Sequence, residues 1–96
     1  MADRTKLTSQ EIDRGLADLV GWTVEHGKLH KEFRFPDFAR AFGFMSSVAL
    51  IAEGMNHHPE WSNVYNRVVI DLTTHDAGGI TGLDLELARR VEAVLR

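Results

Sequence analysis

The chain has 96 residues, of which 44% are hydrophobic and 26% charged, and its formal net charge is -3. This length fits one domain, which we expect to span residues 1–96, and the composition is that of a globular protein rather than a disordered one. Its 11 Lys and Arg residues are fewer than its 14 Asp and Glu residues and are scattered along the chain, so no nucleic-acid partner is expected.

The sequence also argues against a disulfide framework and a membrane segment. No cysteine is present, which excludes disulfides, thiolate zinc sites and cysteine nucleophiles. Residues 1–8 are polar and lack the apolar core of a signal peptide. The longest uninterrupted apolar run, residues 48–52, is far shorter than the roughly 20 residues that cross a bilayer. We therefore expect a cytoplasmic protein with no membrane partner.

The first predicted element is a short amphipathic helix. Thr8 and Glu11 form the pattern of a capping box, in which each side chain accepts a hydrogen bond from the backbone N–H of the other residue. Ile12 and Leu16 follow at helical spacing, and Gly21 ends the pattern. We expect this helix to lie on the core and to carry no chemistry.

Residues 22–26 and 29–35 are expected to form a β-hairpin. The second run alternates apolar and polar residues, with Leu29 and Phe33 on one face. The glycine at position 27 allows a tight turn between the two runs. His26 and His30 flank this turn, and as isolated polar positions they are expected to be solvated.

A long helix is predicted over residues 38–55, after Pro36 and Asp37 break the preceding strand. A helix in a small monomer normally carries one apolar stripe, whereas this one carries two. The second stripe indicates contact with another subunit, and the alternative is a helix buried deep in the monomer. The first stripe contains Phe38, Ala41, Phe42, Met45, Val48, Ala49 and Ala52, and the second contains Phe44, Ile51 and Met55.

The second half of the chain repeats the pattern of two strands and a helix. Residues 61–65 and 68–75 are strand-like, with His75 at the end of the second run. Thr81 and Asp84 form a second capping box, which opens the last helix. The chain is therefore predicted to be an α+β protein: a four-stranded antiparallel sheet with helices packed on one face, in the order α-β-β-α-β-β-α.

The most unusual segment is His57-His58-Pro59, where the long helix gives way to a strand. Histidine titrates near pH 6.5, so one imidazole can give a proton while another takes one at neutral pH. Glu53 lies one helical turn before His57, where a carboxylate can orient the ring. The two histidines therefore favour a proton-transfer reaction in a cleft, and such a reaction requires no redox group.

Three further residues, Tyr65, His75 and Asp84, lie at the ends of other predicted elements and are expected to converge on the same cleft. Each supporting residue has a plainer alternative. Asp84 is also the acidic residue of a capping box, and Glu53 is also a solvated charge at a helix end. Tyr65, like the neighbouring Trp61, can be a packing aromatic, and for Trp61 this is the preferred interpretation.

A metal site is the chief competing explanation for paired histidines, because imidazoles are common metal ligands. Side chains of consecutive residues in an extended segment point apart, so His57 and His58 are poorly placed to chelate one ion. No H-E-x-x-H motif or other close cluster is present. We therefore expect no metal.

The spacing of these residues is more specific than any one of them. Glu53 is followed by His57-His58-Pro59, and then by Tyr65, His75 and Asp84. This pattern resembles the signature of the pterin-4a-carbinolamine dehydratase family, above all in residues 56–68, NHHPEWSNVYNRV. The likeness continues through residues 73–76, 79–81 and 84–85 and extends from about Leu7 to the C-terminus, with no departure at a signature position.

The resemblance implies an activity. Members of this family convert 4a-hydroxytetrahydropterins, such as 4a-hydroxytetrahydrobiopterin, to the quinonoid dihydropterin and water. This step supports tetrahydropterin recycling for aromatic amino-acid hydroxylases and needs no cofactor. The resemblance also implies a homodimer or homotetramer, assembled through sheet edges and the long helix.

By position, the resemblance assigns His57, His58 and His75 as catalytic. Our hypothesis is that His57 and His75 exchange protons with the 4a-oxygen and a ring nitrogen, while His58 mainly holds the pterin. Tyr65 would also bind substrate, and Glu53 and Asp84 would be supporting carboxylates.

Two other functions stay open on the sequence. Some relatives act as protein-binding modules, either as a transcriptional coactivator or as an assembly factor, and nothing in this chain specifies such a partner. The other is pterin handling outside the hydroxylase cycle. The intact set of three histidines favours the enzyme, because a purely structural descendant has no need of them.

Overall fold

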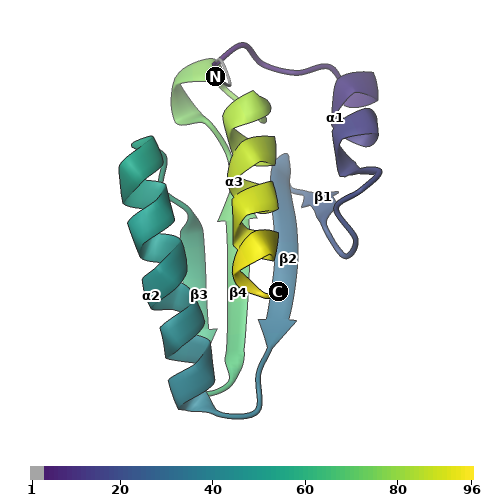
Figure 1. Ribbon diagram of the computed structural model, residues 1–96. Coiled ribbons are helices and arrows are strands. Elements are labelled where there is room, and N and C mark those ends of the chain that lie inside the picture. The colour runs from purple at the N-terminus through teal and green to yellow at the C-terminus, as the bar shows by residue number, and fades with distance from the viewer. Residues whose placement is uncertain (1–3) are drawn as a thin grey trace.

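The computed structural model describes residues 4–96, and its order of elements confirms the predicted α+β fold (Figure 1). Within residues 4–96, a short 3₁₀ helix, η1, is the one element that the sequence did not predict. The elements are α1 (Ser9–Leu16), β1 (Thr23–Glu25), β2 (Lys28–Arg34), α2 (Phe38–Met55), β3 (Glu60–Val64), β4 (Arg67–Leu72), η1 (His75–Ala77) and α3 (Gly82–Val94).

The four strands form one antiparallel sheet in the order β1-β2-β4-β3. The central pair β2 and β4 runs in register from Leu29 opposite Leu72 to Arg34 opposite Arg67. Between β1 and β2 the chain turns at residues 26 and 27, both with positive φ, as the two-residue hairpin turn that fits the twist of a sheet requires. The predicted hairpin is therefore confirmed, the two later strand-like runs pair with each other as β3 and β4, and the two central strands come from different pairs.

Helices α2 and α3 lie in front of the sheet, and α1 lies beyond the β1 side (Figure 1). Alternation along β4 places Val68, Ile70 and Leu72 on the covered face, where all three are fully buried. The opposite face of β4 is only half-buried. One face of the sheet thus holds the core, and polar side chains are free to gather on the other.

Helix α2 has two apolar sides, as predicted, but the membership predicted for them is wrong. Its buried residues recur at intervals of three and four and include Phe44, whereas Phe38 and Phe42 are about half exposed. Phe44 packs against Phe33 and Phe35, with ring centroids 4.9 Å apart in both pairs. The sequence pattern mixed the two sides because apolar residues follow one another almost without a break.

Strand β4 ends at Leu72, before the predicted end at His75. The carbonyl of Thr74 accepts hydrogen bonds from the backbone N–H groups of residues 77, 78 and 79, and Gly78 adopts a left-handed conformation with φ of 75°. This tight turn cannot continue a strand, so His75 begins the 3₁₀ helix η1 instead. None of the helices within residues 4–96 is long and apolar enough to cross a membrane.

Candidate active site

The end of helix α2 positions the double histidine. Asn56 adopts a left-handed conformation, with φ of 52° and ψ of 42°, and its N–H bonds the carbonyl of Glu53. The N–H of His57 reaches back to the carbonyl of Ala52 at 3.0 Å. These two bonds make a Schellman motif, which ends a helix and reverses the direction of the chain. The reversal leaves His57 buried, with 6% of its surface exposed.

The buried partner of His57 is Asp84, which is fully enclosed at the start of α3. The Nε2 atom of His57 lies 2.5 Å from Oδ1 of Asp84. The other carboxylate oxygen accepts from the hydroxyl of Thr74 and from the backbone N–H of Thr81, both at 2.9 Å. An ionised carboxylate only accepts hydrogen bonds, so Nε2 of His57 is the donor to an ionised Asp84.

Asp84 therefore makes both of the contacts that its two possible functions would require. It completes the capping box of α3 with Thr81, and it holds His57. The hydroxyls of Thr74 and Thr81 lie 2.8 Å apart and close the network. Among the described residues, no buried side-chain nitrogen or oxygen lacks a hydrogen-bond partner, and such closed polar networks keep their members in one arrangement.

Glu53 pairs with His58, and the expected pairing of Glu53 with His57 is wrong. Nε2 of His58 lies 2.8 Å from Oε1 of Glu53, and both side chains are more than half exposed. The left-handed turn at Asn56 is the physical reason. A continuing helix would place His57 over Glu53, but the reversal carries His57 inward and leaves His58 outside.

His75 is held by a residue that the sequence analysis missed. Its Nε2 lies 3.0 Å from Oε2 of Glu60, the first residue of β3. The other oxygen of Glu60 accepts from Nζ of Lys28 on β2 at 2.5 Å. The hydrogen bond from Lys28, and after it the positive charges of Lys28 and His75, keep the pKa of Glu60 below its usual 4.5. The same hydrogen bond keeps the pKa of Lys28 above its usual 10.5.

All three histidines line one hollow of about 200 Å³. It lies where the end of α2 meets the segment between β4 and η1. Its wall also includes Arg4, which lies 4.0 Å from the carboxylate of Asp76 and gave no signal in the sequence. The full lining is Arg4, Asn56, His57, His58, Thr73, Thr74, His75 and Asp76.

The three rings share one arrangement: each is held through Nε2 by a carboxylate from a different element. An ionised carboxylate only accepts hydrogen bonds, so each neutral ring carries its proton on Nε2. The Nδ1 atom of each ring is then the one left for a ligand. A bound molecule would meet several groups that can take a proton, or give one when charged.

The other candidate residues lie elsewhere. Tyr65 is exposed in the turn between β3 and β4, with φ of 52°, at the opposite end of β3 from Glu60. Trp61 packs against the core, which confirms the preferred interpretation of this residue as a packing aromatic. His30 pairs with Asp71 at 2.8 Å across β2 and β4, outside the hollow. His26 is exposed in the first hairpin turn.

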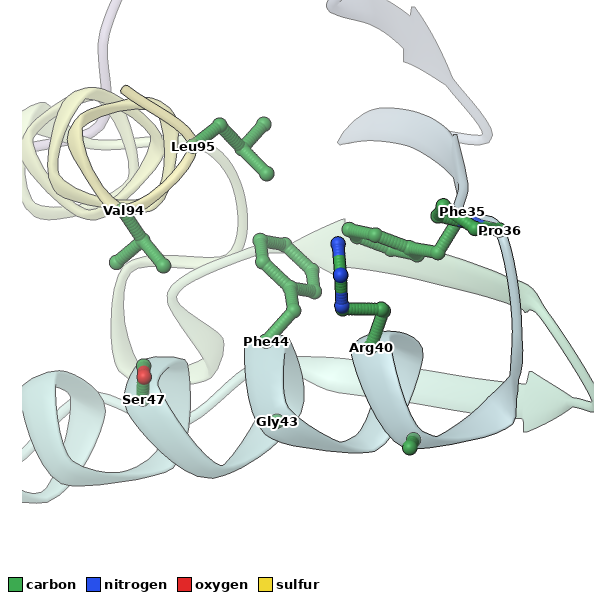
Figure 2. A pocket seen from close by; sticks show the side chains of 9 residues that line it. Phe35, Pro36, Arg40, Gly43, Phe44, Ser47, Val94 and Leu95 are labelled. Carbon is green, nitrogen blue, oxygen red and sulfur yellow. The ribbon is translucent and has the colours of Figure 1, made fainter.

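A second, larger hollow of about 380 Å³ lies between the first half of α2 and the end of α3 (Figure 2). The rings of Phe35 and Phe44 and the side chains of Val94 and Leu95 line it, and Arg40 is the one charged residue of its lining. It contains no histidine or carboxylate, so it offers no pair of groups for acid–base chemistry. Residues 4–96 contain no group of three or more His, Cys, Asp or Glu side chains that could hold a metal ion.

Comparison with known proteins agrees with the likeness noted in the sequence. The family model described as pterin 4 alpha carbinolamine dehydratase matches residues 5–94. The chain belongs to the pterin-4a-carbinolamine dehydratase family. The match includes every residue of the histidine hollow except Arg4.

Individual relatives cover nearly the whole chain. A protein of Solibacter usitatus with the provisional name pterin-4-alpha-carbinolamine dehydratase is 60% identical, over 94% of this chain and 95% of its own length. One from Synechococcus with the same provisional name is 59% identical, over 79% of this chain and 82% of its own. The crystal structure of a transcriptional coactivator/pterin dehydratase from Brucella melitensis superposes with a TM-score of 0.90 at 44% identity, covering 94% of this chain and 98% of that one.

Proposed function

We propose that the protein is a 4a-hydroxytetrahydropterin dehydratase, which releases water and forms the quinonoid dihydropterin by histidine acid–base catalysis. The observation that carries this proposal is the hollow in which His57, His58 and His75 are each held by a carboxylate through Nε2. Membership of the family supports the choice of substrate. The proposed setting is the cytoplasm, in tetrahydropterin recycling for aromatic amino-acid hydroxylases.

The reaction needs one acid and one base. The C4a–O bond breaks as the oxygen is protonated and leaves as water. A base takes the proton of the neighbouring ring nitrogen, whose electron pair forms the new bond to C4a. One proton has moved from nitrogen to oxygen, and the two imidazoles end with exchanged protonation states, which solvent resets. We assign the proton transfers to His57 and His75 and pterin binding mainly to His58, with Tyr65 as a second binding residue.

The burial of His57 supports its part in this mechanism. A charged imidazole is costly to bury unless it is paired, and Asp84 supplies the pairing charge at 2.5 Å. His58 is paired with Glu53, and both side chains are more than half exposed; its assignment to pterin binding belongs to the same hypothesis. No further cofactor is part of the proposal.

Stopped-flow decay of enzymatically generated 4a-hydroxytetrahydropterin tests the function. We expect the wild-type protein to accelerate the decay, and His57→Gln and His75→Gln to lose about 10²-fold, the lower end of what a positioned acid or base contributes. His58→Gln should act mainly on KM. The matched control is His30→Gln, since His30 is also paired with a carboxylate but lies outside the hollow. Wild-type rates in both the His57 and His75 variants would contradict the mechanism.

We further propose a homodimer or homotetramer. Phe38 and Phe42 stand about half exposed on α2 with their rings 5.8 Å apart, and Leu50 on the same helix is 77% exposed. Exposed aromatic residues that gather on one helix favour burial against another chain. Light scattering should show a particle at least twice the 10.8 kDa of the chain; a monomer alone would contradict this part.

A second candidate is a protein-binding function, favoured by the same exposed residues of α2 and by the coactivator named in the description of the Brucella protein. Binding of this kind does not use the histidine hollow. The two functions are separated by His57→Gln, which should slow dehydration about 10²-fold and leave partner binding through α2 intact.

A further inference from the structure

The open face of the sheet carries a row of charged side chains that ends at His75. Glu60 on β3 lies opposite Asp71 on β4, and Asp71 lies opposite His30 on β2. The two acids on neighbouring strands take different partners: Asp71 pairs with His30 at 2.8 Å, and Glu60 pairs with Lys28 at 2.5 Å. Lys28 occupies only one oxygen of Glu60, so the other oxygen is left for a second partner.

Glu60 uses its two oxygens separately. Oε1 accepts from Nζ of Lys28, and Oε2 lies 3.0 Å from Nε2 of His75. The bridge thus joins β2, β3 and η1 across the strand β4. A carboxylate fixed at both oxygens cannot swing away from the imidazole without losing Lys28. Of the three histidine partners in the site, Glu60 is the one that is itself anchored by a cation.

His75 has few other restraints. Its side chain is 80% exposed, and it begins a single turn of 3₁₀ helix that contains no buried residue. A side chain this exposed normally samples several rotamers. His57, by contrast, is enclosed and fixed by its surroundings. Whatever orients the ring of His75 must therefore come from its contact with Glu60.

We propose that Glu60 is a positioning residue for His75: held by Lys28, it accepts the Nε2 proton of His75 and fixes the ring with Nδ1 available to the substrate. The inference rests on the proposed dehydratase function and assigns a task to a residue outside the lining of the hollow. Glu60 does not line the hollow, so the task assigned to it acts through His75. Lys28 acts one step further away, by keeping Glu60 charged and directed.

Three variants test the bridge. Glu60→Ala removes the acceptor, Glu60→Gln keeps a neutral acceptor, and Lys28→Met removes the anchor. The matched control is Glu32→Ala, because Glu32 is also a sheet carboxylate in ion pairs, with Arg34 and Arg67. We expect kcat to fall about three- to tenfold in Glu60→Ala with KM unchanged, and to recover in part in Glu60→Gln. This is well below the roughly 10²–10⁴-fold of a group that transfers the proton itself, because the contact is exposed and acts indirectly.

A second measurement reads the ring directly and does not depend on activity. Nitrogen-15 NMR of the imidazoles should show the proton of neutral His75 on Nε2 in the wild type, with an ordered ring. In Glu60→Ala the two tautomers should mix and the order parameter of the ring should fall, while Glu32→Ala leaves both unchanged. An unchanged His75 spectrum in Glu60→Ala would overturn the proposal. If the wild type failed to speed carbinolamine decay, the proposed function would fall, and the NMR comparison would still decide whether Glu60 orients His75.

Discussion

At the scale of single residues, Asp84 combines the capping of α3 with the pairing of His57, and one substitution can separate the two. In Asp84→Asn, the amide oxygen can still accept from Thr74 and Thr81, so the start of α3 is kept. The amide nitrogen would instead donate to Nε2 of His57 and move the ring proton to Nδ1. We expect carbinolamine turnover to fall about as far as in His57→Gln, with a loss of stability near 1 kcal/mol.

The comparison variant is Asp84→Ala, which loses the cap as well as the pairing. It should lose about 2–3 kcal/mol of unfolding free energy in urea, because the groups that bonded Asp84 stay buried without a partner. Equal stability of the Ala and Asn variants would contradict a capping function, and wild-type turnover in the Asn variant would show that the charge of Asp84 is not needed.

The pair of Glu60 and Lys28 gives a prediction about pH. Because the pKa of Glu60 is lowered in the folded protein, the pair stabilises the fold above the usual pKa of 4.5, and this contribution disappears as the pH falls through the lowered value. In Lys28→Met the pKa of Glu60 should rise towards 4.5, measured by carbon-13 NMR of the carboxyl group. The stability difference between the two proteins should be small, since the pair is exposed, and should vanish in acid. A pKa for Glu60 that does not change would rule out Lys28 as its cause.

The sequence predicted which residues form the site better than it predicted which of them pair with one another. His57, His58 and His75 do line one hollow, which their positions at the ends of elements had suggested. Their partners depend on one backbone torsion, the positive φ of Asn56, and on the register that brings Glu60 near Lys28. Neither is visible in a periodic pattern. A signal for Glu60 existed, because it comes directly after His57-His58-Pro59 and begins a strand.

At the scale of elements, the end of α2 decides where His57 lies. Asn56 tolerates the left-handed conformation better than other residues with a side chain, and glycine tolerates it best. We expect Asn56→Gly to keep the stability and turnover of the wild type, whereas Asn56→Ala should lose about 1 kcal/mol. Urea unfolding and the stopped-flow rate measure both effects.

Asn56 also lines the hollow, so the two substitutions control each other. Both remove its side chain, and only the alanine opposes the turn. If Gly and Ala variants lost turnover equally, the side chain of Asn56 would matter rather than its conformation.

The ends of elements were predictable where a side chain marks them. The capping boxes of Thr8 with Glu11 and of Thr81 with Asp84 are both present. The end of β4 was not predictable, because the β-prone residues Thr73 and Thr74 prolong the strand-like run past Leu72 and the turn is made by backbone bonds to Thr74. Caps made by side chains can be predicted from a sequence, whereas a turn held by backbone hydrogen bonds to a carbonyl group has no distinctive sequence pattern.

At the scale of the whole molecule, Tyr65 and α2 both bear on whether a second copy of the chain contributes to the site. Tyr65 follows β3, and five residues at about 3.3 Å each separate it from Glu60, so it lies on the order of 16 Å along the strand from the residue that holds His75. Tyr65 is not among the residues that line the hollow of its own chain. If Tyr65 binds substrate, as the family resemblance implies, it must do so in a hollow of another copy.

Charges placed on α2 test this link between assembly and activity. Phe38→Glu with Phe42→Glu should reduce the particle to the mass of one chain, 10.8 kDa, in light scattering, because two carboxylates would have to be buried in the interface. The control is Val20→Glu, whose side chain is 83% exposed in the turn after α1. If assembly supplies Tyr65, the double variant of Phe38 and Phe42 and the variant Tyr65→Ala should each raise KM by a similar factor. The factors should be the same in the wild-type protein and in the Val20→Glu control. Combining the double variant with Tyr65→Ala should raise KM no further than either change alone. A monomeric double variant with the wild-type KM would assign the substrate entirely to the hollow of a single chain.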